Sequence, residues 1–162
     1  MKKNSLLILA FSLMLTEMMA LNGCKDDEPA GVQADQNVYE LMSASTNYTT
    51  ILSAIDRAGL KDLLSNTDVT FFAPVNDAFL VTGAIDPKAL TDAEVTQFIK
   101  NHLVLGKFTT GDFPQPGYIT SEAQMGPSGE KLSLLTSKTT GSTRVNSAQI
   151  NSSTDATNGI LH

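Results

Sequence analysis

His102 and His162 are the two histidines of the sequence and Cys24 is its one cysteine, so these three side chains hold most of its chemical options. A zinc site needs several such ligands at fixed spacing. No carboxylate or second histidine lies at ligand spacing on the predicted helix face of His102, so we expect no metal site. We interpret His102 as a core imidazole hydrogen-bonded at both ring nitrogens, with contact to a partner or a metal as the alternative.

The sequence lacks the motifs of common catalytic sites. It contains no Gly-x-Ser-x-Gly elbow, no phosphate loop with Gly-Lys-Ser/Thr, no Gly-x-Gly-x-x-Gly and no His-Glu-x-x-His. Two carboxylates in a cleft would suffice for a glycosidase, but the aspartates are spread over separate predicted elements. Those in the first part of the predicted domain are Asp56, Asp62, Asp68, Asp77, Asp86 and Asp92. We therefore expect a non-enzymatic protein without a cofactor, and a hydrolase is the least favoured alternative.

The first 23 residues have the pattern of an export signal. Lys2 and Lys3 precede a largely apolar run from Leu6 to Leu15. A membrane-spanning helix needs about 20 apolar residues, and Glu17 would bring a charge into any extension of this run. The pattern therefore predicts a cleaved signal peptide over residues 1–23.

The residues before Cys24 favour a lipid anchor. The stretch Leu21-Asn22-Gly23-Cys24 resembles the processing site of bacterial lipoproteins. The resemblance implies cleavage just before Cys24 and lipidation of its thiol, and two or three acyl chains hold a protein durably on a membrane. The alternative is a secreted protein cut near Ala20, with Cys24 as a free thiol.

Residues 24–36 are predicted to form a flexible acidic tether behind the lipidated cysteine, because they offer no period and little apolar surface. Within this tether, the run Lys25-Asp26-Asp27-Glu28 resembles the acidic export tag of surface lipoproteins of some Gram-negative bacteria. The resemblance implies a protein anchored to the outer membrane and exposed at the cell surface. A solvated spacer is the alternative reading of the same four residues.

The charge balance argues against nucleic acid as a partner. The chain carries 11 Lys and Arg against 17 Asp and Glu, a net charge of −6. Removal of residues 1–23 takes away two lysines and one glutamate and leaves −7. The few cations are scattered along the sequence, whereas a surface that follows phosphates collects them in one stripe.

Periodicity predicts helices first. Asn37 with Glu40 makes a capping box ahead of an apolar i, i+3, i+4 pattern. A second helix follows over residues 47–59, with Gly59 as its left-handed end, and residues 60–64 add one apolar turn. Thr91 with Glu94 caps a third helix. Its apolar face comprises Val95, Phe98, Ile99, His102 and Leu103.

Strands follow for the most part later in the chain. Residues 68–73 are rich in β-branched and aromatic side chains and end at Pro74, so they predict a strand buried on both faces. Glycines and prolines after Thr110 separate further strands at 118–123, 131–136 and 143–150. This order predicts an α+β domain, with a layer of helices on a mostly antiparallel sheet or sandwich.

Three segments resemble the fasciclin-like domain family in the family's order. They are Phe71-Phe72-Ala73-Pro74-Val75-Asn76-Asp77-Ala78-Phe79, then Phe98 to Phe108, and Asn158-Gly159-Ile160-Leu161-His162. The resemblance implies a fasciclin-like fold over residues 37–162 and structural roles for the motif residues. These are Phe71, Phe72, Pro74, Asn76, Phe79, Asn158, Gly159 and His162. From the residue type, we expect Asn76 to cap the turn that begins at Asp77.

The resemblance also implies a function in adhesion. The family's Tyr-His segment has been implicated in binding cell-surface receptors, and it corresponds here to Asn101 and His102, with asparagine in place of tyrosine. We therefore hypothesise an anchored, non-catalytic adhesion domain that binds an extracellular or envelope protein. The alternative is a glycan-binding accessory lipoprotein of a polysaccharide-uptake system. In the family the second signature continues into a closing strand, so we expect this domain to lack that strand after His162.

Overall fold

The computed structural model describes residues 35–125 and 128–162 of the 162-residue chain. The predicted signal peptide (1–23), the lipidation site Cys24 and the tether up to residue 34 lie outside the described residues. In the part that is described, no helix is both long enough and apolar enough to cross a membrane.

The helices are short, and most of their starts are set by the local sequence. They are α2 (Val38–Ser43), α3 (Thr49–Arg57), α4 (Lys61–Asn66) and α5 (Asp92–Asn101), with 3-10 turns η1 (Thr46–Tyr48), η2 (Asn76–Phe79) and η3 (Pro87–Ala89). Both predicted capping boxes are present, at Asn37 with Glu40 and at Thr91 with Glu94. Gly59 has the predicted left-handed conformation after α3, with φ of +67°.

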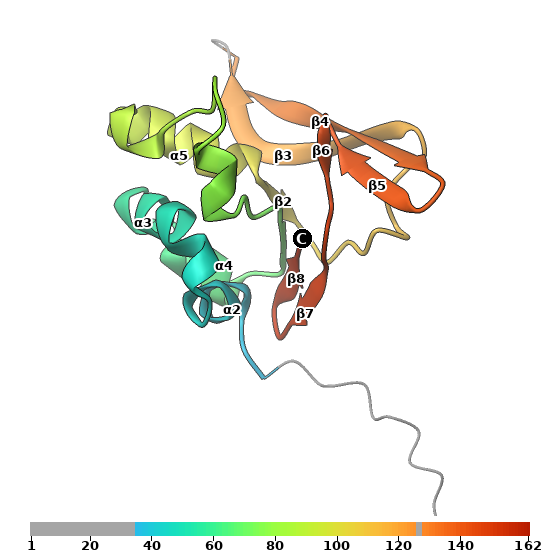
Figure 1. Ribbon diagram of the computed structural model, residues 1–162, viewed down its shortest axis with the longest axis horizontal. Coiled ribbons are helices and arrows are strands. Elements are labelled where there is room, and N and C mark those ends of the chain that lie inside the picture. The colour runs from blue at the N-terminus through green and yellow to red at the C-terminus, as the bar shows by residue number, and fades with distance from the viewer. Residues whose placement is uncertain (1–34, 126–127) are drawn as a thin grey trace, which may run out of the picture. The chain divides into compact units, whose positions relative to one another are not determined.

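The strands form two four-stranded sheets. One has the order β2-β1-β8-β7, with β1 (Val69–Phe71), β2 (Leu103–Leu105), β7 (Thr154–Ala156) and β8 (Gly159–Leu161). The other has the order β3-β4-β5-β6, with β3 (Gly117–Met125), β4 (Glu130–Thr139), β5 (Ser142–Val145) and β6 (Ala148–Gln149). All pairs are antiparallel except β1 with β8. The predicted α+β class is confirmed, with helices α2 to α5 together on one side in Figure 1.

The main core lies between the four α-helices and the sheet that contains β1. Every residue of β1 is buried, as predicted for this strand. The fully buried side chains include Val38, Met42, Ile51, Ile55, Leu64, Phe71, Val95, Ile99 and Leu103. A smaller cluster of Val104, Leu134 and Val145 joins the two sheets. Of the three motif phenylalanines, Phe71 is fully buried, whereas Phe72 and Phe79 are half-buried.

Two predicted boundaries were wrong for tertiary reasons. The predicted strand 143–150 is two strands, because the chain turns at Asn146, which has a φ of +53° and exchanges hydrogen bonds with Leu135. The predicted helical face extended to Leu103, but α5 ends at Asn101 and Leu103 pairs with Phe71 in the sheet. Cross-strand pairing thus overrides the helical period at this point.

Asn158 joins three elements that are distant in sequence. Its Oδ1 accepts from the Val38 N–H at 2.9 Å, and its Nδ2 donates to the carbonyls of Leu64 at 2.9 Å and Thr67 at 2.8 Å. The Asn158 carbonyl accepts from the Val69 N–H at 2.9 Å. Asn158 therefore supplies hydrogen-bond partners to the first N–H of α2, to two carbonyls at the C-terminal end of α4 and to the first N–H of β1.

The prediction that Asn76 caps the turn beginning at Asp77 was wrong. Its side chain makes no bond to the turn that it begins. Instead Oδ1 accepts from the Thr50 N–H at 3.0 Å and the Thr49 hydroxyl at 3.2 Å, and Nδ2 donates to the Thr46 carbonyl at 2.8 Å. Asn76 therefore caps the start of α3 from across the fold, where the preceding residue, Tyr48, offers no side-chain cap.

Candidate functional site

His102 lies at the C-terminal end of α5, the first residue past the helix. Its Nδ1 lies 2.8 Å from the Phe98 carbonyl oxygen, and its ring packs at 4.7 Å from the Phe98 ring. Because a carbonyl only accepts, Nδ1 carries the proton and Nε2 presents a lone pair. Nε2 has no hydrogen-bond partner among the described residues, so the expectation of bonds at both ring nitrogens was wrong for His102.

His162 has the arrangement that was expected of His102. Its Nε2 donates to the Phe108 carbonyl at 2.9 Å, and its Nδ1 accepts from the Ser153 hydroxyl at 2.8 Å. The ring is stacked on Phe72, with centroids 5.5 Å apart, and meets the edge of Phe113. His162 is therefore a structural imidazole that follows β8 and ties the chain to Ser153 and Phe108 by hydrogen bonds.

Burial lowers the pKa of both histidines below the ordinary value of 6.5, and the carbonyl contacts of Phe98 and Phe108 only partly oppose this effect. Both rings are therefore neutral in the folded protein at pH 7. The unfolded chain therefore binds protons at these histidines at a higher pH than the folded chain does. The stability that comes from keeping both rings neutral is complete above about pH 6.5 and is lost as the pH falls below that value.

We expect the melting temperature of the protein to fall when the pH is lowered from 7.5 to 5.5. Differential scanning calorimetry at constant ionic strength measures this change. The double variant His102→Gln/His162→Gln should show a flatter profile over the same range, because it lacks both depressed groups. A wild-type melting temperature that stays constant or rises toward pH 5.5 would contradict the neutral, buried state of the rings.

His102 lines two cavities on different sides. One, of about 260 Å³, also contacts Phe72, Pro74 and His162. The other, of about 320 Å³, is formed mainly by the loop that runs from η2 toward η3. Asn101 lines neither of these cavities. It lines a third, of about 540 Å³, and accepts only a long hydrogen bond of 3.5 Å from Ser121. The two residues of the predicted partner-binding pair therefore line different cavities.

Two of these cavities form a continuous groove along α5. Ile85 and Phe98 line both the loop cavity and the cavity beside Asn101, so the two spaces adjoin there. We call this surface the α5 groove. Among the described residues, Glu94 is the one charged side chain that lines it. Its walls combine apolar side chains such as Phe98 with polar ones such as Gln97. His102 lines one of the two cavities and Asn101 the other.

Three exposed apolar side chains lie on the loop that borders the α5 groove. Leu80 is 80% exposed, Val81 63% and Ile85 55%. We call these three residues the apolar patch. Contiguous exposed apolar residues are uncommon on soluble monomers and mark surfaces where another molecule binds. Sequence reasoning missed this patch, although the aperiodic apolar stretch around Gly83 was a visible signal.

The described residues hold no group of three or more His, Cys, Asp or Glu side chains that could share a metal ion. The three tyrosines do not gather on one face. Tyr39 donates to Asp56 and lies beneath Lys61, Tyr48 lines the cavity beside His102, and Tyr118 is exposed on β3.

Comparison with known proteins identifies the family and the fold. Residues 46–162 match the family model described as the fasciclin domain. Among solved structures, the chain is similar to a FAS1 domain pair from the insect cell adhesion molecule fasciclin I, with a TM-score of 0.62 and 15% identity. The match covers 80% of this chain and 49% of that one, so the chain spans about half of its length. A comparison with curated proteins gave no match.

Proposed function

This chain belongs to the fasciclin domain family, and from that premise we propose that it is a non-catalytic adhesion domain that binds a protein through the apolar patch and the α5 groove. The observation that carries the proposal is the exposure of Leu80, Val81 and Ile85 beside a groove with one charged residue. Apolar anchors that enter a partner's pockets supply most of the affinity in protein interfaces. His102 lines the groove as well and carries a ring nitrogen, Nε2, that has no hydrogen-bond partner among the described residues.

The triple variant Leu80→Ser/Val81→Thr/Ile85→Thr tests this surface. Beads coated with the full chain are incubated with cell envelopes of the source organism, and retention is measured. We expect retention to drop at least tenfold with the variant, because it loses all three anchors. The melting temperature should stay within about 2 °C of wild type, since exposed side chains contribute little to folding.

Leu105→Thr is the matched control, because Leu105 is also an exposed apolar residue but lies on β2, away from the patch. It should retain envelopes as the wild type does. Protease treatment of the envelopes should abolish retention if the partner is a protein. Equal retention by the triple variant and the wild type would refute the patch as the binding surface. Retention that survives protease but not glycosidases would favour the glycan alternative.

We also propose that the domain is held at the outer membrane by lipid on Cys24 and faces the exterior of the cell. The support is the export pattern and the lipoprotein-like stretch that ends at Cys24. The mass of the amino-terminal peptide from native membranes tests this point. An acylated peptide beginning at Cys24 supports the anchor, and an unmodified peptide cut near Ala20 refutes it.

A further inference from the structure

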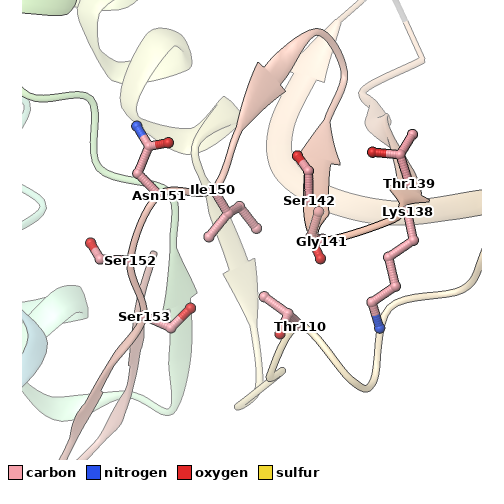
Figure 2. Close-up of a pocket in the computed structure, with 10 residues that line it drawn as sticks. Thr110, Lys138, Thr139, Gly141, Ser142, Ile150, Asn151, Ser152 and Ser153 are labelled. Atoms are coloured by element: carbon pink, nitrogen blue, oxygen red, sulfur yellow. The ribbon is translucent and has the colours of Figure 1, made fainter.

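A fourth cavity lies beside residues 150–153, which form one of its walls. It has a volume of about 460 Å³, within the size range of small-molecule sites. Figure 2 shows that its walls come from the β4–β5 hairpin, from residues 150–153 and from Thr110. Six hydroxyl side chains line it, those of Thr110, Thr139, Ser142, Thr143, Ser152 and Ser153. We call it the hydroxyl cavity.

The hydroxyl of Ser142 is unsatisfied. Among the described residues, Ser142 Oγ is the one buried side-chain polar atom without a hydrogen-bond partner. This atom has almost no exposed surface, so a ligand in the cavity does not contact it, and a ligand that carries its own hydroxyl groups meets the other hydroxyls of the walls instead.

Ser153 is already oriented for such a ligand. Because His162 Nε2 donates to the Phe108 carbonyl, His162 Nδ1 must accept, and the Ser153 proton is committed to it. Ser153 Oγ therefore offers only lone pairs to the cavity. The wall is also held in place, since the Ile150 N–H donates to the Thr143 carbonyl at 2.9 Å. Fixed acceptors of this kind favour a polyhydroxylated ligand.

The charge of the cavity is positive, although the chain as a whole is acidic. Of the residues that the structure describes, Lys138 is the one charged side chain that lines it, and no carboxylate among them does. Lys138 forms no ion pair with any described residue. The sheet register sets its position, because Lys138 lies directly opposite Thr143 on the next strand. One ammonium group matches one negative charge, such as a single carboxylate.

We propose that the hydroxyl cavity binds a hexuronate, an acidic sugar residue whose carboxylate pairs with Lys138 and whose hydroxyls donate to Ser153 Oγ. A neutral hexose would leave the ammonium group unpaired. A small carboxylate such as acetate would leave the hydroxyl-lined walls empty. The site is separate from the apolar patch, so this proposal does not depend on the proposed adhesion surface.

The test is titration of the isotope-labelled full chain with D-glucuronate and D-galacturonate, followed by amide chemical shifts. D-glucose and acetate at matched ionic strength are the comparison ligands. We expect saturable shifts confined to residues 138–143, 150–153 and Thr110, with either uronate binding at least tenfold more tightly than glucose or acetate. Equal affinity for glucose, equal affinity for acetate, or shifts centred elsewhere would each overturn the proposal.

Two variants assign the contacts. Lys138→Gln should weaken uronate binding at least tenfold, whereas Lys131→Gln should change it less than twofold, because Lys131 lies on the same strand but pairs with Glu122 outside the cavity. Ser153→Ala should weaken uronate binding several-fold, because it removes the fixed acceptor that His162 orients. Unchanged affinity in Lys138→Gln would refute the carboxylate contact, and unchanged affinity in Ser153→Ala would refute the hydroxyl contact.

Discussion

Replacement of Gly159 by alanine is expected to destabilise the fold severely. A Cβ at this position would lie 2.0 Å from the Val69 carbonyl oxygen and 3.0 Å from Val38 Cγ2. Val69 is the register partner of Gly159 in the parallel pair of β1 with β8. Because the clashing carbonyl belongs to the backbone of β1, no side-chain rotation relieves the clash. Separating β1 from β8 opens the main core, and we expect a cost of about 4 kcal/mol or more.

A loss of this size is a large share of the stability of a domain, which is typically about 5–15 kcal/mol. Circular dichroism and urea unfolding of the full chain measure it. Gly111→Ala is the matched control, because its Cβ would meet only the Thr109 hydroxyl, at 3.3 Å. A cooperative transition at the wild-type urea midpoint in Gly159→Ala would show that β1 and β8 do not pack as described.

Replacement of Asn158 by alanine is the second large effect that we expect. The change leaves the Val38 N–H and the carbonyls of Leu64 and Thr67 without a hydrogen-bond partner inside the protein. Each unsatisfied buried group costs about 1–3 kcal/mol, and the three share one site, so we expect a total of about 3–5 kcal/mol. Urea unfolding should therefore show a much lower midpoint with a similar slope.

Asn47→Ala serves as the control for Asn158→Ala, because Asn47 is exposed on η1 and its side chain makes no hydrogen bond to a described residue. Its midpoint should match that of the wild type. Aspartate at position 158 gives a further check, since it keeps the acceptor for Val38 and loses the two donors. Asn158→Asp should be no more stable than Asn158→Ala at pH 7, because it places a buried carboxylate oxygen against the carbonyl oxygens of Leu64 and Thr67.

These effects explain why the family motifs of this chain are mainly structural. Asn158 and Gly159 join α2, α4 and β1, and Asn76 fastens η2 to the start of α3. The motif residues thus hold the helices against the sheet. The apolar patch and the hydroxyl cavity lie outside these motifs, on a loop and around a hairpin, where substitution alters a binding surface without disturbing the frame.

The sequence by itself determined the features that depend on neighbouring residues. The capping boxes at Asn37 and Thr91, the end of α3 at Gly59 and the buried strand at 69–71 could be predicted, because caps, periods and breakers act over one or two turns of chain. The ordered motifs also predicted the fasciclin fold, since they preserve the contacts that build it.

Only the tertiary structure decided which distant groups meet. Asn76 caps a helix that begins 27 residues earlier, Asn101 and His102 line different cavities, and the hydroxyl cavity draws its walls from three separate segments. The exposure of Leu80, Val81 and Ile85 was equally hidden, because an apolar residue in a loop can face either the core or solvent. Such outcomes depend on long-range strand pairing and packing, which local propensity does not encode.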